Sequence, residues 1–298
     1  MKILVTGANG LLGQKLIERW QGDPSIDLYT TARRAAVLPV DPDKFFLADL
    51  TDPHAVEALV DRIKPDTIVH TAAMTQVDQC EQDKAGCWKV NVDAVDYLIQ
   101  ASRKNNAHLV HLSTDFIFDG SHGPLQESDQ PNPVNYYGES KVAAEKLVME
   151  SGLTWSIVRT VLVYGITQDM SRSNIITWVK KNLEAGSVIK VVTDQWRTPT
   201  LAEDLAEGCH LVAVQRATGV YHISGKDFLT PHQMALQTAD FFQLDASLIQ
   251  ETNAAIFKET ARRPLRTGFI IDKAVRELGY APHSFREGMA LVSSQLKK

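Results

Sequence analysis

A glycine-rich turn near the start of the chain constrains the fold more than any other feature. The apolar run at residues 3–5 predicts a buried strand, and apolar residues at helical spacing over 11–17 predict a helix directly after the turn. Gly7 permits the tight bend, Gly10 lets the backbone approach a pyrophosphate, and Gly13 lets helix and strand pack closely. The first N–H groups of the helix and its dipole attract phosphate. The pattern predicts a dinucleotide-binding turn, with a purely structural glycine turn as the alternative.

Composition narrows the class of protein. The chain has 298 residues, 44% of them hydrophobic, which is enough for one large or two interlocked domains with a substantial core. A formal charge of −5 argues against a nucleic-acid partner, and no apolar run is long enough to span a membrane. Three cysteines and nine histidines show no spacing typical of a metal site, so we predict no metal and free thiols. We therefore expect a cytoplasmic protein.

Predicted strands and helices alternate through the first half of the chain. The expected strands there cover residues 27–31, 44–48, 67–70, 107–112 and 154–159, and the expected helices 53–63, 85–103 and 137–150. In the second half we expect helices at 175–183, 200–214, 231–242, 272–278 and 284–295, and strands at 188–192 and 220–224. This order predicts an α/β fold with a doubly wound parallel sheet (Rossmann) and a smaller C-terminal α/β substrate lobe.

The domain boundaries are predicted from the point, after residue 165, where strands and helices no longer alternate regularly. We expect a cofactor-binding domain at 1–165 with a returning segment at about 196–225, and a substrate-binding lobe at about 166–195 and 226–298. In such sheets ligands bind beyond the carboxyl ends of the strands.

The end of the second strand bears on the choice of nucleotide. An NAD site usually has an acidic residue there, but this chain reads Thr-Thr-Ala and then Arg33 and Arg34. A guanidinium attracts a 2′-phosphate, so we favour NADP(H), with NAD(H) as the alternative and solvated arginines as the structural explanation. After the third strand, Asp49 is expected near the adenine or as a helix cap, a role for which Asp52 is better placed.

Two residues in the 137–150 helix are of the types that together form a proton donor. Tyr137 and Lys141 stand four residues apart, so their side chains share one helix face. A nearby ammonium group lowers the pKa of a tyrosine from its usual value of about 10. An exposed tyrosine and lysine without a role are the alternative. Tyr136 is a rival, but Ser140, four residues on, carries no charge.

A hydroxyl at the end of the fifth strand completes the set. Thr114 or Ser113 is expected to reach the same pocket as Tyr137 and to hydrogen-bond a substrate carbonyl; a strand-end turn capped by Asp115 is the alternative.

Taken together, these segments resemble the extended short-chain dehydrogenase/reductases and, within them, the dTDP-4-dehydrorhamnose reductase family. The resemblance rests on residues 6–13, 71–78, 91–95, 113–120, 137–141, 192–195, 199–200, 204–206 and 263–264. It implies Thr114, Tyr137 and Lys141 as catalytic residues.

The glycine turn and the resemblance together give the expected binding residues. For the cofactor these are Gly7, Asn9, Gly10, Leu11, Leu12, Gly13, Arg33, Arg34, Asp49, Leu50, Thr71, Ala72 and Ala73, with Tyr137 and Lys141. For the substrate they are Thr75, Val77, Asp115, Asn174 and Arg197.

Three positions depart from that family. Leu162 stands where the family usually has a tryptophan, and Arg197 replaces an expected glycine. Lys15 stands where an acidic residue is sometimes tied to metal-assisted dimerisation, so bound magnesium and a homodimer both stay open. Arg197 has two interpretations, a contact with a diphosphate or phosphate and a surface pair with Asp194.

The predicted activity is NADPH-dependent reduction of a 4-keto group on a nucleotide-linked deoxysugar. Tyr137 protonates the nascent alkoxide, Thr114 holds the oxygen, and Lys141 lowers the pKa of Tyr137 and binds the nicotinamide ribose. The alternatives are a nucleotide-sugar epimerase or dehydratase on the same fold, and a non-catalytic subunit similar to the reductase-like subunit of methionine adenosyltransferase. The sequence does not identify the sugar.

Overall fold

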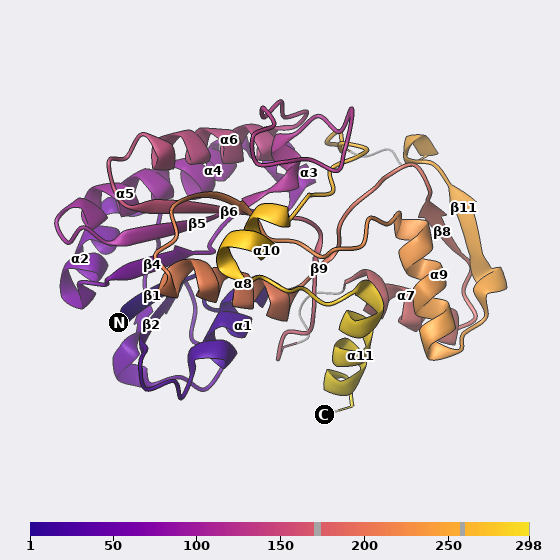
Figure 1. Cartoon of the computed structure of the whole chain (residues 1–298), viewed down its shortest axis with the longest axis horizontal. Helices are drawn as coiled ribbons and strands as arrows, with labels where there is room; N and C mark the ends of the chain where they lie inside the picture. Colours follow the sequence, from indigo (N-terminus) through magenta and orange to yellow (C-terminus); the bar gives the residue numbers. More distant parts are fainter. Residues whose placement is uncertain (170–173, 257–259, 298) are drawn as a thin grey trace.

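A parallel sheet runs through the larger part of the computed structural model, which describes residues 1–169, 174–256 and 260–297. Within these residues seven strands lie in the order β10-β6-β5-β4-β1-β2-β3, and all neighbours are parallel (Figure 1). The strands are β1 (Lys2–Thr6), β2 (Asp27–Ala32), β3 (Phe45–Leu47), β4 (Thr67–His70), β5 (His108–Thr114), β6 (Trp155–Thr160) and β10 (Gly219–His222). The order reverses between β1 and β4, so the crevice for a ligand lies beyond their carboxyl ends. The expected doubly wound sheet is confirmed.

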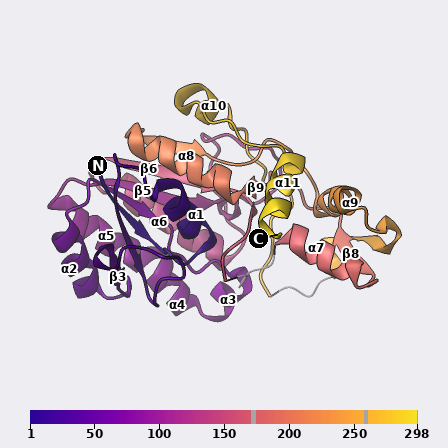
Figure 2. The ribbon, with the colours of Figure 1, turned by 90° about the horizontal axis from the view of Figure 1, so that it is seen from below.

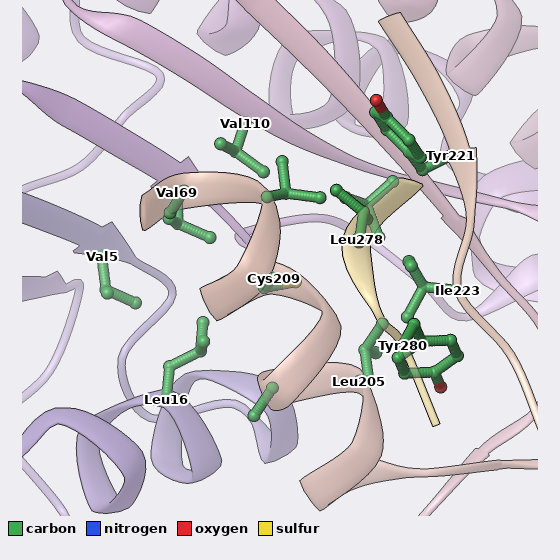
Figure 3. Close-up of a cluster of buried hydrophobic side chains, with 14 of the residues drawn as sticks. Val5, Leu16, Val69, Val110, Leu205, Cys209, Tyr221, Ile223, Leu278 and Tyr280 are labelled. Atoms are coloured by element: carbon green, nitrogen blue, oxygen red, sulfur yellow. The ribbon is translucent and has the colours of Figure 1, made fainter. Parts of the chain in front are cut away.

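Helices cover both faces of this sheet. One face carries α2 (Pro53–Ile63), α5 (Ala94–Arg103) and α6 (Tyr136–Met149), and the other carries α1 (Leu11–Trp20), α8 (Ala202–Val214) and α10 (Asp272–Leu278). Because side chains alternate along a strand, Leu4 of β1 packs into the first layer and Val5 into the second. Figure 3 shows Val5 and its neighbours on β4 and β5 facing Leu16 and Cys209 of the covering helices.

A smaller lobe lies beyond one end of the sheet. It contains α7 (Ile175–Glu184), α9 (Pro231–Phe242) and a parallel pair of strands, β8 (Ile189–Val192) and β11 (Ile249–Thr252). Figure 2 places α7, α9 and β8 together, far from α2. The junction holds a second short pair, β7 (Val163–Tyr164) and β9 (Thr200–Leu201), and helix α11 (Phe285–Gln295).

Single-turn helices complete the described chain. The 3₁₀ turns are η1 (Pro42–Lys44), η3 (Asp115–Ile117), η4 (Ala246–Leu248) and η5 (Ala254–Ile256). In the part of the chain that the structure describes, no helix is both long and apolar enough to cross a membrane.

The helix expected at 85–103 is confirmed as a continuous helical stretch over 84–103, but one turn within it is π-helical. It contains α4 (Lys84–Trp88), a π-helical turn η2 (Lys89–Asp93) and α5, preceded by the unpredicted α3 (Val77–Gln82). The π turn carries buried Asn91, whose side chain bonds both the N–H and the C=O of Met74 at 2.8 and 3.1 Å. Its Nδ2 also donates to Ser140 Oγ at 3.0 Å. The irregular turn therefore ties the loop after β4 to α6.

The other expected elements match the structure to within two residues, with a few differences. Residues 200–201 form β9 before α8 rather than the start of a helix, and β7 and β11 were not predicted. Helix α2 has its predicted bounds because Asp52 caps it, accepting a hydrogen bond from His54 N at 2.9 Å.

Candidate active site

The glycine turn forms a cradle that side chains would fill. Gly7 has φ +72°, and a Cβ there would lie 2.7 Å from Thr71 Oγ1 and 2.8 Å from Ala72 N. A Cβ on Gly13 would overlap the carbonyl oxygen of Gly7. Bare backbone is thus required on both sides of the turn.

The start of α1 points free donors into this cradle. Gly10 is the N-cap, and in the described chain no side chain caps the helix and no acidic residue stands in its first turn. The first N–H groups and the helix dipole therefore remain available to an anion. A diphosphate fits this arrangement.

Asn9 anchors the loop that carries the two arginines. Its Nδ2 donates to Ala35 O at 2.8 Å and to Arg34 O at 3.3 Å, and its Oδ1 accepts from Val37 N at 3.1 Å. Arg33 and Arg34 are exposed. Asn9 thus fastens the backbone of the loop that follows the two arginines to the glycine turn, a role that its expected contact with the cofactor did not include.

Residues after β3 are engaged in local structure. Asp49 accepts hydrogen bonds from the backbone and the hydroxyl of Thr51 at 2.9 and 2.8 Å, and these bonds lower the pKa of its carboxyl. Leu50 is buried in the core beside α2. The helix cap is Asp52, as the spacing predicts.

The segment after β4 lies across the cradle from α1. Thr71 Oγ1 donates to Thr6 O at 2.7 Å, which brings Ala72 close to Gly7. Further along, Thr75 is exposed and Val77, the first residue of α3, is half-buried.

Tyr137 stands at the start of α6, a position fixed by Asn135, whose Oδ1 accepts from Gly138 N at 2.9 Å. The Tyr137 side chain is 8% exposed and lies beside the Thr114 side chain. Burial raises the pKa of Tyr137 above its ordinary value, and the neighbouring Thr114 hydroxyl opposes this. The phenol is therefore neutral and carries a proton at physiological pH.

Lys141 is oriented differently from the prediction. Its ammonium group donates to Leu112 O at 2.6 Å and to His111 Nε2 at 3.1 Å, and burial lowers its pKa to about 8. The expected lowering of the Tyr137 pKa by Lys141 is not seen, because burial dominates at the phenol.

Thr114, rather than Ser113, is the hydroxyl beside Tyr137. Thr114 Oγ1 accepts from Phe116 N at 3.2 Å and donates to Asp115 Oδ1 at 3.1 Å, whereas Ser113 Oγ is buried without a hydrogen bond in the described structure. The rival Tyr136 packs against Trp88, with the Lys84 ammonium 4.9 Å from its ring centre.

Both interpretations of Arg197 differ from the structure. The guanidinium is buried, 4% exposed, with Nε 3.6 Å from Asp115 Oδ2, so it forms neither a surface pair nor an open phosphate site. Asp194 instead accepts from Ala254 N at 3.0 Å. Asp115, expected to contact substrate, is 2% exposed.

Asn174 also has a structural role. Its Oδ1 caps α7 at Ile176 N and Thr177 N, and its Nδ2 donates to Gly165 O at 2.7 Å. The nearby Leu162 has φ +36° and is 42% exposed, an uncommon backbone conformation for leucine.

Two buried histidines were missed by sequence reasoning. His70 ends β4 and pairs in register with His111 in the middle of β5, and their rings stack with centres 5.5 Å apart. His70 Nδ1 pairs with Thr6 Oγ1 at 2.8 Å. Their matching positions in two neighbouring predicted strands were the available signal. Across the described residues, no group of three His, Cys, Asp or Glu side chains is arranged to hold a metal.

Comparisons with known proteins agree with this geometry. A model of the family "RmlD substrate binding domain" matches residues 1–298. The chain is 35% identical to a dTDP-4-dehydrorhamnose reductase of Burkholderia thailandensis, over 79% of this chain and 76% of that one. It is 32% identical to methionine adenosyltransferase 2 subunit beta of Bos taurus, over 83% and 73%. A Bacillus anthracis dTDP-4-dehydrorhamnose reductase solved in complex with NADP has a TM-score of 0.86 at 28% identity, covering 99% of both chains.

The buried histidines predict a loss of stability in mild acid. Burial, with the Lys141 charge, lowers the pKa of His70 to about 3, so between that pH and about 6.5 only the unfolded chain binds a proton. We measure the free energy of unfolding with urea at about pH 8 and about pH 5. Between these two pH values it should fall by about 2 kcal/mol less in His70→Asn than in the unaltered chain. Asparagine keeps a partner for Thr6.

The matched control is His54→Asn, because that histidine is exposed on α2 and its replacement should leave the pH dependence as it was. If the free energy of unfolding falls equally on acidification in the unaltered chain and in His70→Asn, His70 is not held neutral by the fold.

Proposed function

We propose that this chain, which belongs to the RmlD substrate binding domain family, is an NADPH-dependent reductase of a 4-keto group on a nucleotide-linked deoxysugar. The observation that carries the proposal is that a protonated Tyr137 lies beside Thr114 at the end of β5, two strands from the glycine cradle on the same edge of the sheet. The Burkholderia relative, named a dTDP-4-dehydrorhamnose reductase, supports a deoxysugar nucleotide as substrate.

The cradle and the arginine loop would hold the dinucleotide. The first N–H groups of α1 would bind the diphosphate, and Arg33 and Arg34 would pair with a 2′-phosphate. The NADP-bound relative supports this assignment, with NAD(H) as the alternative. When bound, the reduced nicotinamide supplies the hydride.

The side chains of the chain supply the proton. Tyr137 donates its hydroxyl proton to the carbonyl oxygen as that oxygen becomes an alkoxide, and Thr114 holds the same oxygen by a hydrogen bond. Acid catalysis of this kind contributes about 10²–10⁴-fold to the rate. A phenol that burial keeps protonated is suited to this step.

Lys141 would stabilise the phenolate that Tyr137 becomes after it has given up its proton. Lys141 lies four residues after Tyr137 on the same helix, and its positive charge would favour the phenolate that remains. We assign to it the contact with the nicotinamide ribose as well. Since burial lowers its pKa to about 8, the ammonium form is held through physiological pH and lost above it.

On the substrate side we keep Thr75 and Val77 as contacts. Both follow β4 at the open edge of the sheet and are at least partly exposed. Asp115, Asn174 and Arg197 are engaged within the protein, so they would act on the substrate indirectly.

A second candidate function is that of a subunit within another enzyme. The observation in its favour is the 32% identity to methionine adenosyltransferase 2 subunit beta. The intact set of Thr114, Tyr137 and Lys141 favours catalysis. A stoichiometric enzyme partner, together with no NADPH oxidation on any nucleotide-linked 4-keto sugar, would favour the subunit.

Replacing the proton donor should abolish turnover without affecting cofactor binding. Tyr137→Phe should lower kcat about 10²–10⁴-fold on a panel of nucleotide-linked 4-keto sugars, measured by loss of NADPH absorbance. The dissociation constant for NADPH should stay within about twofold, because the cradle is untouched. Tyr136→Phe is the control and should keep full activity; near-normal turnover of Tyr137→Phe would remove Tyr137 from the role.

The arginine loop should decide between the two nicotinamide cofactors. A charged hydrogen bond contributes about 1.5–3 kcal/mol, so Arg33→Ala with Arg34→Ala should lower the preference for NADPH over NADH by about 10–100-fold in kcat/KM. Arg276→Ala, an exposed arginine on α10, should leave the preference unchanged. A preference that survives the double replacement would place the 2′-phosphate elsewhere.

A further inference from the structure

A row of buried polar side chains crosses the three central strands of the sheet. Thr6 of β1, His70 of β4 and His111 of β5 are direct neighbours in the sheet register, and none is more than 2% exposed. Thr6 Oγ1 lies 2.8 Å from His70 Nδ1, and the two imidazole rings stack. Because side chains alternate along a strand, the row faces the layer that holds α6. Polar groups are costly to bury, so packing alone does not account for the row.

The row ends at the ammonium group of Lys141, which is held from two sides. Its Nζ donates to Leu112 O at 2.6 Å and to His111 Nε2 at 3.1 Å, and the Lys141 side chain is 3% exposed. A lysine ammonium group has three N–H donors. Two of them are committed to acceptors on β5, so within the described residues one donor remains for a ligand.

The contact with Lys141 determines which nitrogen of His111 carries the proton. An ammonium group has no lone pair, so Nε2 must be the acceptor and the proton of the neutral ring must be on Nδ1. His111 Nδ1 is buried and has no hydrogen-bond partner in the part of the chain that the structure describes. A buried N–H without a partner is costly, and the bond to Lys141 is the contact that fixes the proton there.

We propose that His111 is a positioning residue that accepts a hydrogen bond from Lys141 and, with Leu112 O, fixes the ammonium group so that its third N–H meets the nicotinamide ribose. The proposal rests on the reductase function proposed above, in which Lys141 makes that contact. Stacking on His70 holds the ring of His111 in place, and His70 is held in turn by Thr6, the residue before the glycine turn. The row thus connects the strand that enters the cradle with the helix that carries Tyr137.

A neutral acceptor suits this position better than a carboxylate. An imidazole without charge holds the ammonium group and leaves its positive charge available to the phenolate that forms at Tyr137. A carboxylate in the same place would neutralise that charge. Glu145, one helical turn after Lys141, is itself engaged by Arg159, whose Nε and Nη2 donate to it at 3.0 and 2.7 Å.

Titratable groups face Lys141 from four elements. They are His111 on β5, His70 on β4, Cys87 on α4 and Glu145 on α6 itself. Burial lowers the pKa of Lys141 to about 8, and the charges of Glu145 and Cys87 oppose that shift. A hydrogen bond to the charged form favours that form, so loss of the His111 acceptor should lower the Lys141 pKa further.

The first test measures the Lys141 pKa in cofactor-free protein labelled with ¹³C at lysine Cε, with the resonance assigned by its loss in Lys141→Arg. His111→Phe keeps a ring stacked on His70 but removes the acceptor, so the pKa should fall by about one pH unit. His111→Gln places an amide oxygen where Nε2 stands, so the pKa should stay within about 0.3 pH unit of that of the unaltered chain.

The matched control is His108→Phe. His108 is on the same strand, on the opposite face, and is fully buried, but its Nε2 lies 2.7 Å from Ser156 Oγ rather than beside Lys141. The control should leave the Lys141 pKa unchanged, whatever it does to the thermal midpoint. A Lys141 pKa that stays in place in His111→Phe, or that falls equally in His111→Gln or His108→Phe, would overturn the proposal.

A second measurement needs no substitution. In the unaltered chain labelled with ¹⁵N at histidine, and with the His111 ring assigned through its own backbone amide, the spectrum at about pH 7 should show a proton on Nδ1 and none on Nε2. A proton on Nε2 would overturn the proposal, because His111 could not then accept from the ammonium group. This measurement decides the matter even if His111→Phe does not fold.

Cofactor binding and turnover give a third readout, which a merely structural role would not move. The alkaline loss of kcat/KM, and the alkaline rise of the NADPH dissociation constant, should each begin about one pH unit lower in His111→Phe than in the unaltered chain or His111→Gln. An alkaline limit that stays in place in His111→Phe would contradict the proposal. If the unaltered chain reduces no sugar, the proposed function has failed, and the Lys141 pKa and the His111 proton position then decide whether His111 positions Lys141.

Discussion

The active-site edge of the structure depends on one close approach of bare backbone. The turn after β1 lies so near to the segment after β4 and to the first turn of α1 that Gly7 and Gly13 tolerate no Cβ. That approach leaves the N-terminus of α1 open at the switch point of the sheet, where strand order reverses. A side chain at either glycine would separate α1 from the sheet and close the position at which phosphate binds.

Loss of solvent controls the chemistry of the neighbouring strands. Burial raises the pKa of Tyr137 and lowers that of Lys141 to about 8, so Tyr137 keeps its proton and Lys141 loses its proton above physiological pH. It likewise keeps His70 and His111 neutral. Burial raises the pKa of Asp115, and its contacts with Arg197, Thr267 and Thr114 oppose that shift. The protonation states that reduction needs are thus properties of the fold.

The features that the sequence predicts are those set by residues close together in the chain. The cradle, the α2 bounds with the Asp52 cap, and the shared helix face of Tyr137 and Lys141 follow from short patterns, and they agree with the structure. What it does not predict depends on residues far apart in the chain. Arg197 pairs with Asp115 rather than with the nearby Asp194, and the helix expected at 85–103 contains a π-helical turn, η2, whose Asn91 bonds Met74 and Ser140. No local pattern carries such contacts.

We propose that Tyr137 and Thr114 hold a ketone beside a reduced nicotinamide for reduction. Deuterium transfer from the cofactor to the sugar tests this most directly. The chain is mixed with dTDP-4-dehydrorhamnose and NADPH deuterated at the transferable C4 position, and the sugar product is examined by NMR and mass spectrometry. We expect one deuterium, bonded to C4 of the sugar. A product without deuterium, deuterium at another carbon, or unreacted sugar and cofactor would contradict it.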